Sequence, residues 1–161
     1  ALAILAFLHG RFDEFGFRVG RVKEWVPAVL VLYLLVFPFL GYAAAQPEFR
    51  RVYPLFAPAR QGGVELINYE LVYGLYFFSW EFLFRGLLLF GLAEKFGSLA
   101  IPVQTVPFAL AHLGKPFPEV YASIFAGLIL GALALRGRSI FPCFLLHWAA
   151  ALTLDLLVLY G

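Results

Sequence analysis

Glu81 and Arg85 lie one helical turn apart inside FFSWEFLFRGLLLFGL, a stretch that is otherwise apolar enough for a bilayer. Two more ionisable residues, His112 and His147, occupy comparably apolar segments. A charged side chain at bilayer depth costs roughly 2.5–3.5 kcal/mol even on lenient insertion scales, so these residues need a structural or functional reason. A carboxylate and imidazoles can together remove a proton from water. These residue types therefore indicate a polar site, suited to hydrolysis, where water is scarce.

Each of these residues also has a purely structural interpretation. Glu81 and Arg85 are spaced i,i+4 on one helix face, so they could form an ion pair that only locks helices together. His112 lies near the predicted end of a helix, where the helix dipole favours a cation. His147 has no such explanation, because FPCFLL precedes it and WAAALTL follows it, and we favour a polar-site role. Asp155 continues the same helical stripe and either orients His147 or lies at a helix end.

Other kinds of catalysis have little support in the sequence. The HExxH spacing of zinc peptidases is absent, and the candidate ligands come from three separate helices, so we expect no metal and no cofactor. No GxSxG motif occurs. The possible nucleophiles lie in no recognisable motif; they are Ser79, Ser123, Ser139 and Cys143. Water activated by a carboxylate and an imidazole is what remains.

The composition indicates the kind of fold that must position these residues. The chain has 161 residues, of which 63% are hydrophobic and 14% are charged, and its mean hydropathy is +0.87. Soluble domains average about 45–50% apolar and about 25% charged residues, so we predict an all-α, polytopic transmembrane helix bundle. At this length the bundle holds about 4–6 helices, with no separate soluble domain. A net charge of +2 argues against nucleic-acid binding.

The hydrophobic pattern predicts the elements. Residues 1–25 are expected to hold the end of a truncated helix or signal-like segment, followed by an amphipathic interfacial segment. Residues 26–161 form the bundle. Its helices are predicted at about 26–45, 64–95, 98–112, 118–135 and 139–160. The intervening segment 46–63, rich in proline and arginine, is predicted to be a loop on the membrane surface.

Two further features concern how the helices pack and cross. Pro38 is expected to kink the first helix, and Gly127 and Gly131 form a small-xxx-small pair that allows close helix approach. If every helix crosses, 10–25, 95–98 and 136–138 share one side of the membrane. That side carries more lysine and arginine than the other, which places it in the cytoplasm by the positive-inside rule.

Three segments together are similar to the CPBP family, the CAAX proteases and bacteriocin-processing enzymes also called the Abi family. They are WEFLFRG at 80–86, FALAH at 108–112, and GKPFPEVYASIFAGLILGALALRGRSIFPCFLLHWAAA from 114 onward. The similarity covers about 70–157. It implies a bundle of the CAAX-protease type in a membrane, which we expect to be the bacterial inner membrane. It also implies an intramembrane glutamic-type endopeptidase.

The resemblance suggests a role for each polar residue. Glu81 and His112 would activate water, His147 would stabilise the oxyanion, and Arg85 would hold the site together. Two positions depart from the family pattern. The first glutamate of the usual EExxxR motif is Trp80, and the usual asparagine one turn after the third-motif histidine is Ala151.

Three functions are therefore open. The first is a peptidase that cleaves a membrane-associated or C-terminal-signal-bearing protein, with the lipid bilayer and a protein or peptide as its partners. The second is an inactive CPBP-like subunit or scaffold of a larger membrane complex, which the residues Trp80 and Ala151 suggest. The third is a metal-dependent hydrolase that uses the same side chains.

Overall fold

The computed structural model describes residues 12–161, and the prediction of a truncated helix before them lies outside this range. The described part is helical, with no strand. Its elements are α2 (Val22–Ala45), α3 (Pro47–Val52), η1 (Ala57–Gln61), α4 (Gly63–Glu81), η2 (Phe82–Phe90), α5 (Gly91–Phe96), η3 (Gly97–Leu99), α6 (Ala100–Leu110), α7 (Phe117–Gly137) and α8 (Phe141–Tyr160). The predicted all-α bundle is confirmed.

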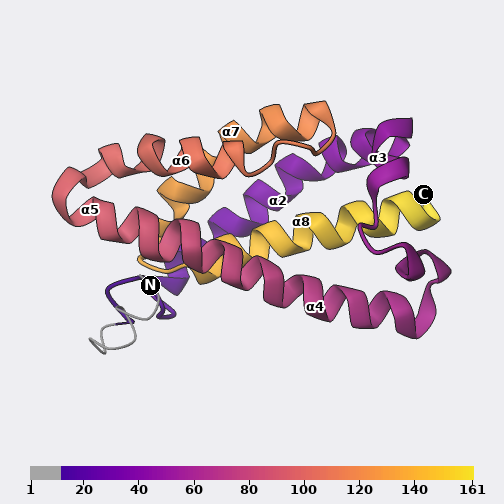
Figure 1. Ribbon diagram of the computed structural model, residues 1–161. Coiled ribbons are helices and arrows are strands. Elements are labelled where there is room, and N and C mark those ends of the chain that lie inside the picture. The colour runs from indigo at the N-terminus through magenta and orange to yellow at the C-terminus, as the bar shows by residue number, and fades with distance from the viewer. Residues whose placement is uncertain (1–11) are drawn as a thin grey trace.

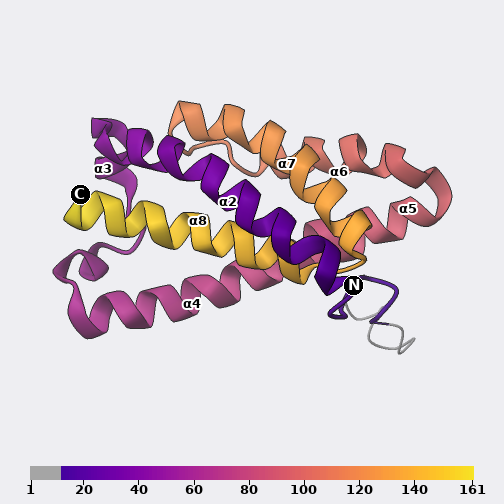
Figure 2. The same cartoon turned by 180° about the vertical axis from the view of Figure 1, so that it is seen from behind.

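The long helices cross one another at oblique angles, and α8 lies between α2 and α4 (Figure 1). The view from behind shows α2 lying across α7 and α8 (Figure 2). Four stretches of the described part are long and apolar enough to cross a membrane: Val22–Ala45, Gly63–Leu110, Phe117–Gly137 and Phe141–Tyr160. The chain is therefore a membrane protein by the length and composition of its helices.

The structure differs from the expected elements in three places. The segment 46–63 is not a plain loop, since it contains the short helices α3 and η1. The first long helix begins at Val22, so the end of the expected interfacial segment belongs to α2. The helix α6 has 11 residues, about 16 Å at 1.5 Å per residue, and cannot cross a core of about 30 Å by itself. The chain therefore runs along α4, η2 and α5 to one end of the bundle, reverses direction, and comes back along the shorter α6.

The close approach of α6 and α7 depends on glycine, as the small-xxx-small pattern predicts. A Cβ on Gly127 would lie 2.7 Å from Cγ2 of Thr105, closer than packed atoms allow. The carbonyl oxygen of Gly127 accepts a hydrogen bond of 2.8 Å from Nε2 of Gln104. Because Gln104 and Thr105 are buried, this polar contact is shielded from the membrane. It fixes α6, the helix that leads to His112, against α7.

The residues before α2 hold the turn between α7 and α8. The backbone N–H of Ile140 donates to the carbonyl of Gly16 at 3.0 Å, and that of Arg21 donates to the carbonyl of Gly137 at 2.8 Å. The Ser139 hydroxyl donates to the carbonyl of Arg18 at 2.5 Å. These bonds fix the start of α8, and His147 follows less than two turns later.

Candidate active site

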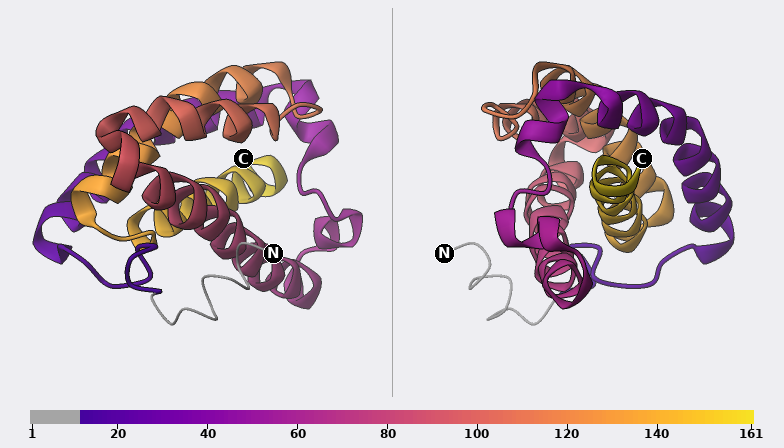
Figure 3. Two further views of the ribbon diagram at one scale, coloured as in Figure 1. Left: turned by 60° about the vertical axis from the view of Figure 1, so that its left-hand side comes forward. Right: turned by 90° about the vertical axis from the view of Figure 1, so that its right-hand side faces the viewer.

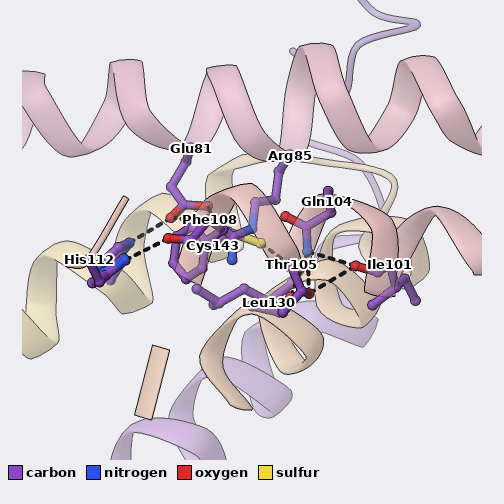
Figure 4. Close-up of polar contacts among 11 residues, drawn as sticks. Glu81, Arg85, Ile101, Gln104, Thr105, Phe108, His112, Leu130 and Cys143 are labelled. Atoms are coloured by element: carbon purple, nitrogen blue, oxygen red, sulfur yellow. Dashed lines mark hydrogen bonds and ion pairs between the residues drawn. The ribbon is translucent and has the colours of Figure 1, made fainter. Parts of the chain in front are cut away.

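Glu81 and Arg85 form a buried ion pair on one face of the α4–η2 helix, as their spacing predicts (Figure 4). Nη1 of Arg85 lies 3.2 Å from Oε1 of Glu81 and 3.1 Å from Oε2. Both side chains are 0% exposed. Glu81 ends α4, and Arg85 lies inside the π-helical segment η2. Such segments inside α-helices are frequent at functional sites, because they shift the direction of the side chains that follow.

His147 reaches this ion pair from α8. Its Nδ1 atom lies 2.6 Å from Oε1 of Glu81, a short distance typical of charge-assisted hydrogen bonds. A carboxylate only accepts, so Nδ1 carries the proton. The other ring nitrogen, Nε2, is then left for a substrate or a water molecule. The His147 side chain is 19% exposed, whereas Glu81 is fully buried, so the imidazole and not the carboxylate is the group that can be reached from outside the protein.

His112 completes the constellation from the residues that follow α6. Its Nδ1 atom donates to the carbonyl of Phe108 at 2.8 Å. Since that oxygen cannot donate, the bond fixes the proton on Nδ1 and leaves Nε2 free. The rings of His112 and His147 are nearly parallel, with centroids 6.3 Å apart. The three helical segments therefore bring together all four residues predicted from the sequence, which are Glu81, Arg85, His112 and His147.

Phe108 is part of the site that the sequence analysis did not identify. The guanidinium carbon of Arg85 lies 3.9 Å from the centre of its ring, where a cation is attracted by the aromatic face. The same ring contacts His112 at 4.7 Å and His147 at 5.9 Å. Phe108 is fully buried. It therefore separates the Arg85 charge from the imidazoles, and its carbonyl also orients His112.

Trp80, the departure from the family motif, lies at the edge of the site. Its ring is edge-on to His112 with centroids 5.8 Å apart, and it also contacts Phe84 at 5.0 Å. Its indole N–H is buried without a hydrogen-bond partner. Trp80 therefore fills space beside His112 with an aromatic wall, where the family usually places a carboxylate.

Two expectations about neighbouring residues are settled by position. The carboxyl oxygens of Asp155 are buried without a hydrogen-bond partner, so Asp155 does not orient His147. It faces Glu70 of α4 instead. Cys143 is buried and donates its S–H to the carbonyl of Leu130 at 3.1 Å, as a structural cysteine does.

Within residues 12–161 no group of three or more His, Cys, Asp or Glu side chains is placed to hold a metal ion.

His147 also borders an apolar cavity between α2, α7 and α8. The cavity has a volume of about 290 Å³. Its walls are aliphatic and aromatic apart from this one imidazole, and they include Leu35, Phe39, Ile129 and Ala150. Leu35 and Phe39 are exposed on a helix that can span the membrane, so the cavity lies next to the lipid. The polar site therefore has an apolar space on one side.

Comparison with known families agrees with this geometry. The family model of the type II CAAX prenyl endopeptidase Rce1-like proteins matches residues 63–153, more than half of the chain. No curated protein and no solved structure matches the chain. The matched range includes all four polar residues of the site, and it confirms the resemblance to CAAX proteases. The chain belongs to the type II CAAX prenyl endopeptidase Rce1-like family.

Proposed function

We propose that this protein is an intramembrane peptidase that hydrolyses a peptide bond of a membrane-associated protein, with water activated by His112 and the oxyanion stabilised by His147 and Glu81. The observation that carries the proposal is the short bond from His147 to Glu81 beside a second, nearly parallel imidazole. These groups come from three helices and meet inside an apolar bundle. Family membership supplies the protein substrate and the membrane setting.

In the proposed mechanism His112 is the base. Its Nδ1 proton is committed to Phe108, so the lone pair of Nε2 accepts a proton from water as the oxygen attacks the substrate carbonyl. His112 then returns that proton to the leaving amine. The proton that leaves water thus ends on the new amino terminus, and the hydroxyl oxygen ends in the new carboxylate.

His147 and Glu81 stabilise the negative charge that forms on the carbonyl oxygen. Glu81 holds the Nδ1 proton of His147, which orients the ring and stabilises its positive form. Before the attack, Nε2 takes up a second proton from water outside the site, and the doubly protonated ring then donates from Nε2 to the oxyanion. One preorganised donor of this kind contributes about 2.7–4 kcal/mol to the rate. Arg85 keeps Glu81 ionised, so its effect on the reaction passes through Glu81.

The apolar cavity beside His147 indicates the chemistry of the substrate near the cleaved bond. A peptide backbone cannot enter a cavity whose wall is apolar apart from one imidazole, because most of its N–H and C=O groups would lose their hydrogen bonds. An apolar side chain, or an apolar group attached to a side chain, can enter this cavity. We therefore propose a substrate with a bulky apolar group next to the cleaved bond.

The experiment is cleavage of a quenched-fluorescent peptide library with apolar C-terminal anchors by purified protein in liposomes. We expect that Glu81→Gln and His112→Ala abolish cleavage. The matched control is Glu65→Gln, because Glu65 is an exposed carboxylate on the same helix α4. Parent-like cleavage by Glu81→Gln or by His112→Ala would overturn the mechanism.

A second candidate is a subunit that keeps the fold but not the reaction. It is favoured by Trp80, whose aromatic ring contacts His112, and by Ala151, which offers no side-chain donor one turn after His147. This candidate predicts stable association with a larger membrane complex. Site-dependent cleavage by the purified protein would exclude it.

A further inference from the structure

The segment between α2 and α4, residues 46–62, crosses one end of the bundle next to the loop that follows α6. We name it the strap. Its central residue Tyr53 lies between α3 and η1 and is 3% exposed. Two views at right angles place α3 beside the α6–α7 loop (Figures 1 and 3). The strap and the loop that carries His112 are therefore neighbours, although they lie far apart in the sequence.

The Tyr53 hydroxyl joins two charged side chains of this neighbouring region. It accepts a hydrogen bond of 2.9 Å from Nζ of Lys115. It lies 2.7 Å from Oε1 of Glu119 and 2.6 Å from Oε2, so its proton is donated to that carboxylate. Lys115 belongs to the α6–α7 loop and Glu119 to the first turn of α7. One hydroxyl thus connects three segments through charge-assisted hydrogen bonds, which are the stronger kind.

The protonation of these groups fits the bridge. Burial raises the pKa of the Tyr53 hydroxyl, and the neighbouring Glu119 charge raises it further, so the group keeps the proton that it donates. Burial lowers the pKa of Lys115, whereas Glu119 raises it. Nζ of Lys115 also lies 4.8 Å from the centre of the Tyr53 ring, a favourable position for a cation. The hydroxyl and the ring of Tyr53 therefore both hold the Lys115 ammonium group in place.

Tyr53 is itself held in a fixed position. Nη2 of Arg60 donates to the Tyr53 carbonyl at 2.6 Å and to the Arg50 carbonyl at 2.9 Å. The Phe49 ring stacks on the Tyr53 ring with centroids 6.1 Å apart. Nε of Arg50 donates to the carbonyl of Ala44 at the end of α2. The hydroxyl therefore projects from a well-anchored support, as a positioning group needs to do.

Lys115 is coupled to His112 through the backbone. The N–H of Lys115 donates to the carbonyl of His112 at 3.1 Å, and Gly114 between them has a positive φ of 94°, which suits glycine. The loop residue Leu113 is 65% exposed, so it adds little packing. A displacement of Lys115 would then be passed to His112 through one tight turn.

We propose that Tyr53 is a positioning residue, whose hydroxyl bridges Lys115 to Glu119 and thereby holds the His112 imidazole in its working orientation. This inference rests on the proposed function, since His112 has to act for its orientation to matter. Tyr53 touches no reacting atom. Its effect is expected on the rate of the chemical step and not on substrate binding.

The test compares Tyr53→Phe with Tyr33→Phe. Each variant loses one tyrosine hydroxyl group. That of Tyr53 bonds to Lys115 and Glu119, whereas that of Tyr33 pairs with Thr153 between α2 and α8 at 2.7 Å, away from the loop. We expect Tyr53→Phe to lower kcat roughly 10- to 100-fold, as small misplacements of catalytic groups do, with KM little changed. Tyr33→Phe should keep the parent kcat. Lys115→Met should lower kcat as Tyr53→Phe does, and the double variant should lose little more.

A second measurement separates positioning from general stability and does not need activity. Hydrogen exchange of the backbone amides in 111–117 should become faster in Tyr53→Phe and stay unchanged in Tyr33→Phe. An unchanged kcat in Tyr53→Phe, while His112→Ala is inactive, would overturn the inference and leave the proposed function intact. If the parent enzyme shows no cleavage, the proposed function fails, and unchanged exchange in Tyr53→Phe would then overturn the bridge as well.

Discussion

Oε1 of Glu81 accepts a hydrogen bond of 2.6 Å from Nδ1 of His147, although the two residues come from different helices and lie inside an apolar bundle. The same carboxylate is paired with Arg85. Glu81 therefore links the two residues: Arg85 neutralises its charge, and its carboxylate orients the His147 ring. A carboxylate held in this way is better suited to orient and charge an imidazole than to take a proton from water directly.

The first prediction concerns Glu81→Gln. The amide keeps the shape but loses the charge, so it can neither stabilise a positive His147 nor enforce the Nδ1 proton. We expect kcat to fall by about 10⁴-fold, the loss found when the carboxylate of a catalytic triad becomes an amide. Single-turnover cleavage by Glu81→Gln, with Glu65→Gln as the control, measures it. A fall of less than tenfold would show that His147 works without the carboxylate.

The second prediction concerns the stability of the ion pair. Removing one partner of a buried pair leaves an uncompensated charge and costs about 3–5 kcal/mol. We therefore expect Glu81→Gln and Arg85→Met each to lower the thermal stability of the protein in detergent. The double variant should be more stable than either single variant, because no charge then remains buried. Additive losses in the double variant would contradict this view of the pair.

These two residues also show how far the sequence alone reaches. The i,i+4 spacing of Glu81 and Arg85, and the apolar context of His147, are local signals, and both pointed to residues that the structure brings into contact. The contacts of Tyr53 with Lys115 and Glu119 join distant segments and leave no local pattern. The same holds for the π-helical segment η2 and for the position of Asp155 opposite Glu70, because each depends on how helices pack. Local periodicity therefore predicted the helices and the polar residues that meet between them, but not the tertiary contacts that support them.

The third prediction concerns variants that restore the family residue at the two positions where this sequence departs from the pattern. Ala151 lies one turn after His147 on α8, and Asn at this position would add a second oxyanion donor. We expect Ala151→Asn to raise kcat, by up to the 10²–10³-fold that one such donor supplies. Steady-state kinetics of the parent and the variant decide it. A lower kcat in Ala151→Asn would mean that position 151 does not face the oxyanion.

Trp80→Glu is the companion variant, with a different expected result. The indole packs against His112 and Phe84, so its removal leaves a void, and the new carboxylate would be half-buried at the position that precedes Glu81 in the chain. We expect Trp80→Glu to lose stability, and to gain activity only if the new carboxylate takes over as the base. Trp80→Phe, which keeps an aromatic ring, is the control for packing. Thermal unfolding and kcat are measured on the same samples.

The fourth prediction tests the cavity next to His147. Ala150 is one of its lining residues, and Phe at this position would fill much of the space. We expect Ala150→Phe to raise KM for peptides with a bulky apolar group beside the cleaved bond, and to leave peptides with a small group nearly unaffected. Equal effects on both kinds of peptide would show that the cavity does not receive the substrate.

The fifth prediction concerns two carboxyl groups that the proposed mechanism does not use. Glu70 on α4 and Asp155 on α8 are 7% and 0% exposed, and none of their carboxyl oxygens has a hydrogen-bond partner. Two ionised carboxylates in such a place would repel each other and lose their hydration, so at least one proton is needed to hold α4 and α8 together. Asp155→Asn supplies that neutral state permanently. We expect it to raise the thermal stability in detergent, most clearly at alkaline pH, whereas Glu48→Gln on the exposed surface should change little. Lower stability of Asp155→Asn at alkaline pH would show that the ionised pair is tolerated, with the positive charge of Lys115, which acts on Asp155, as the compensating charge.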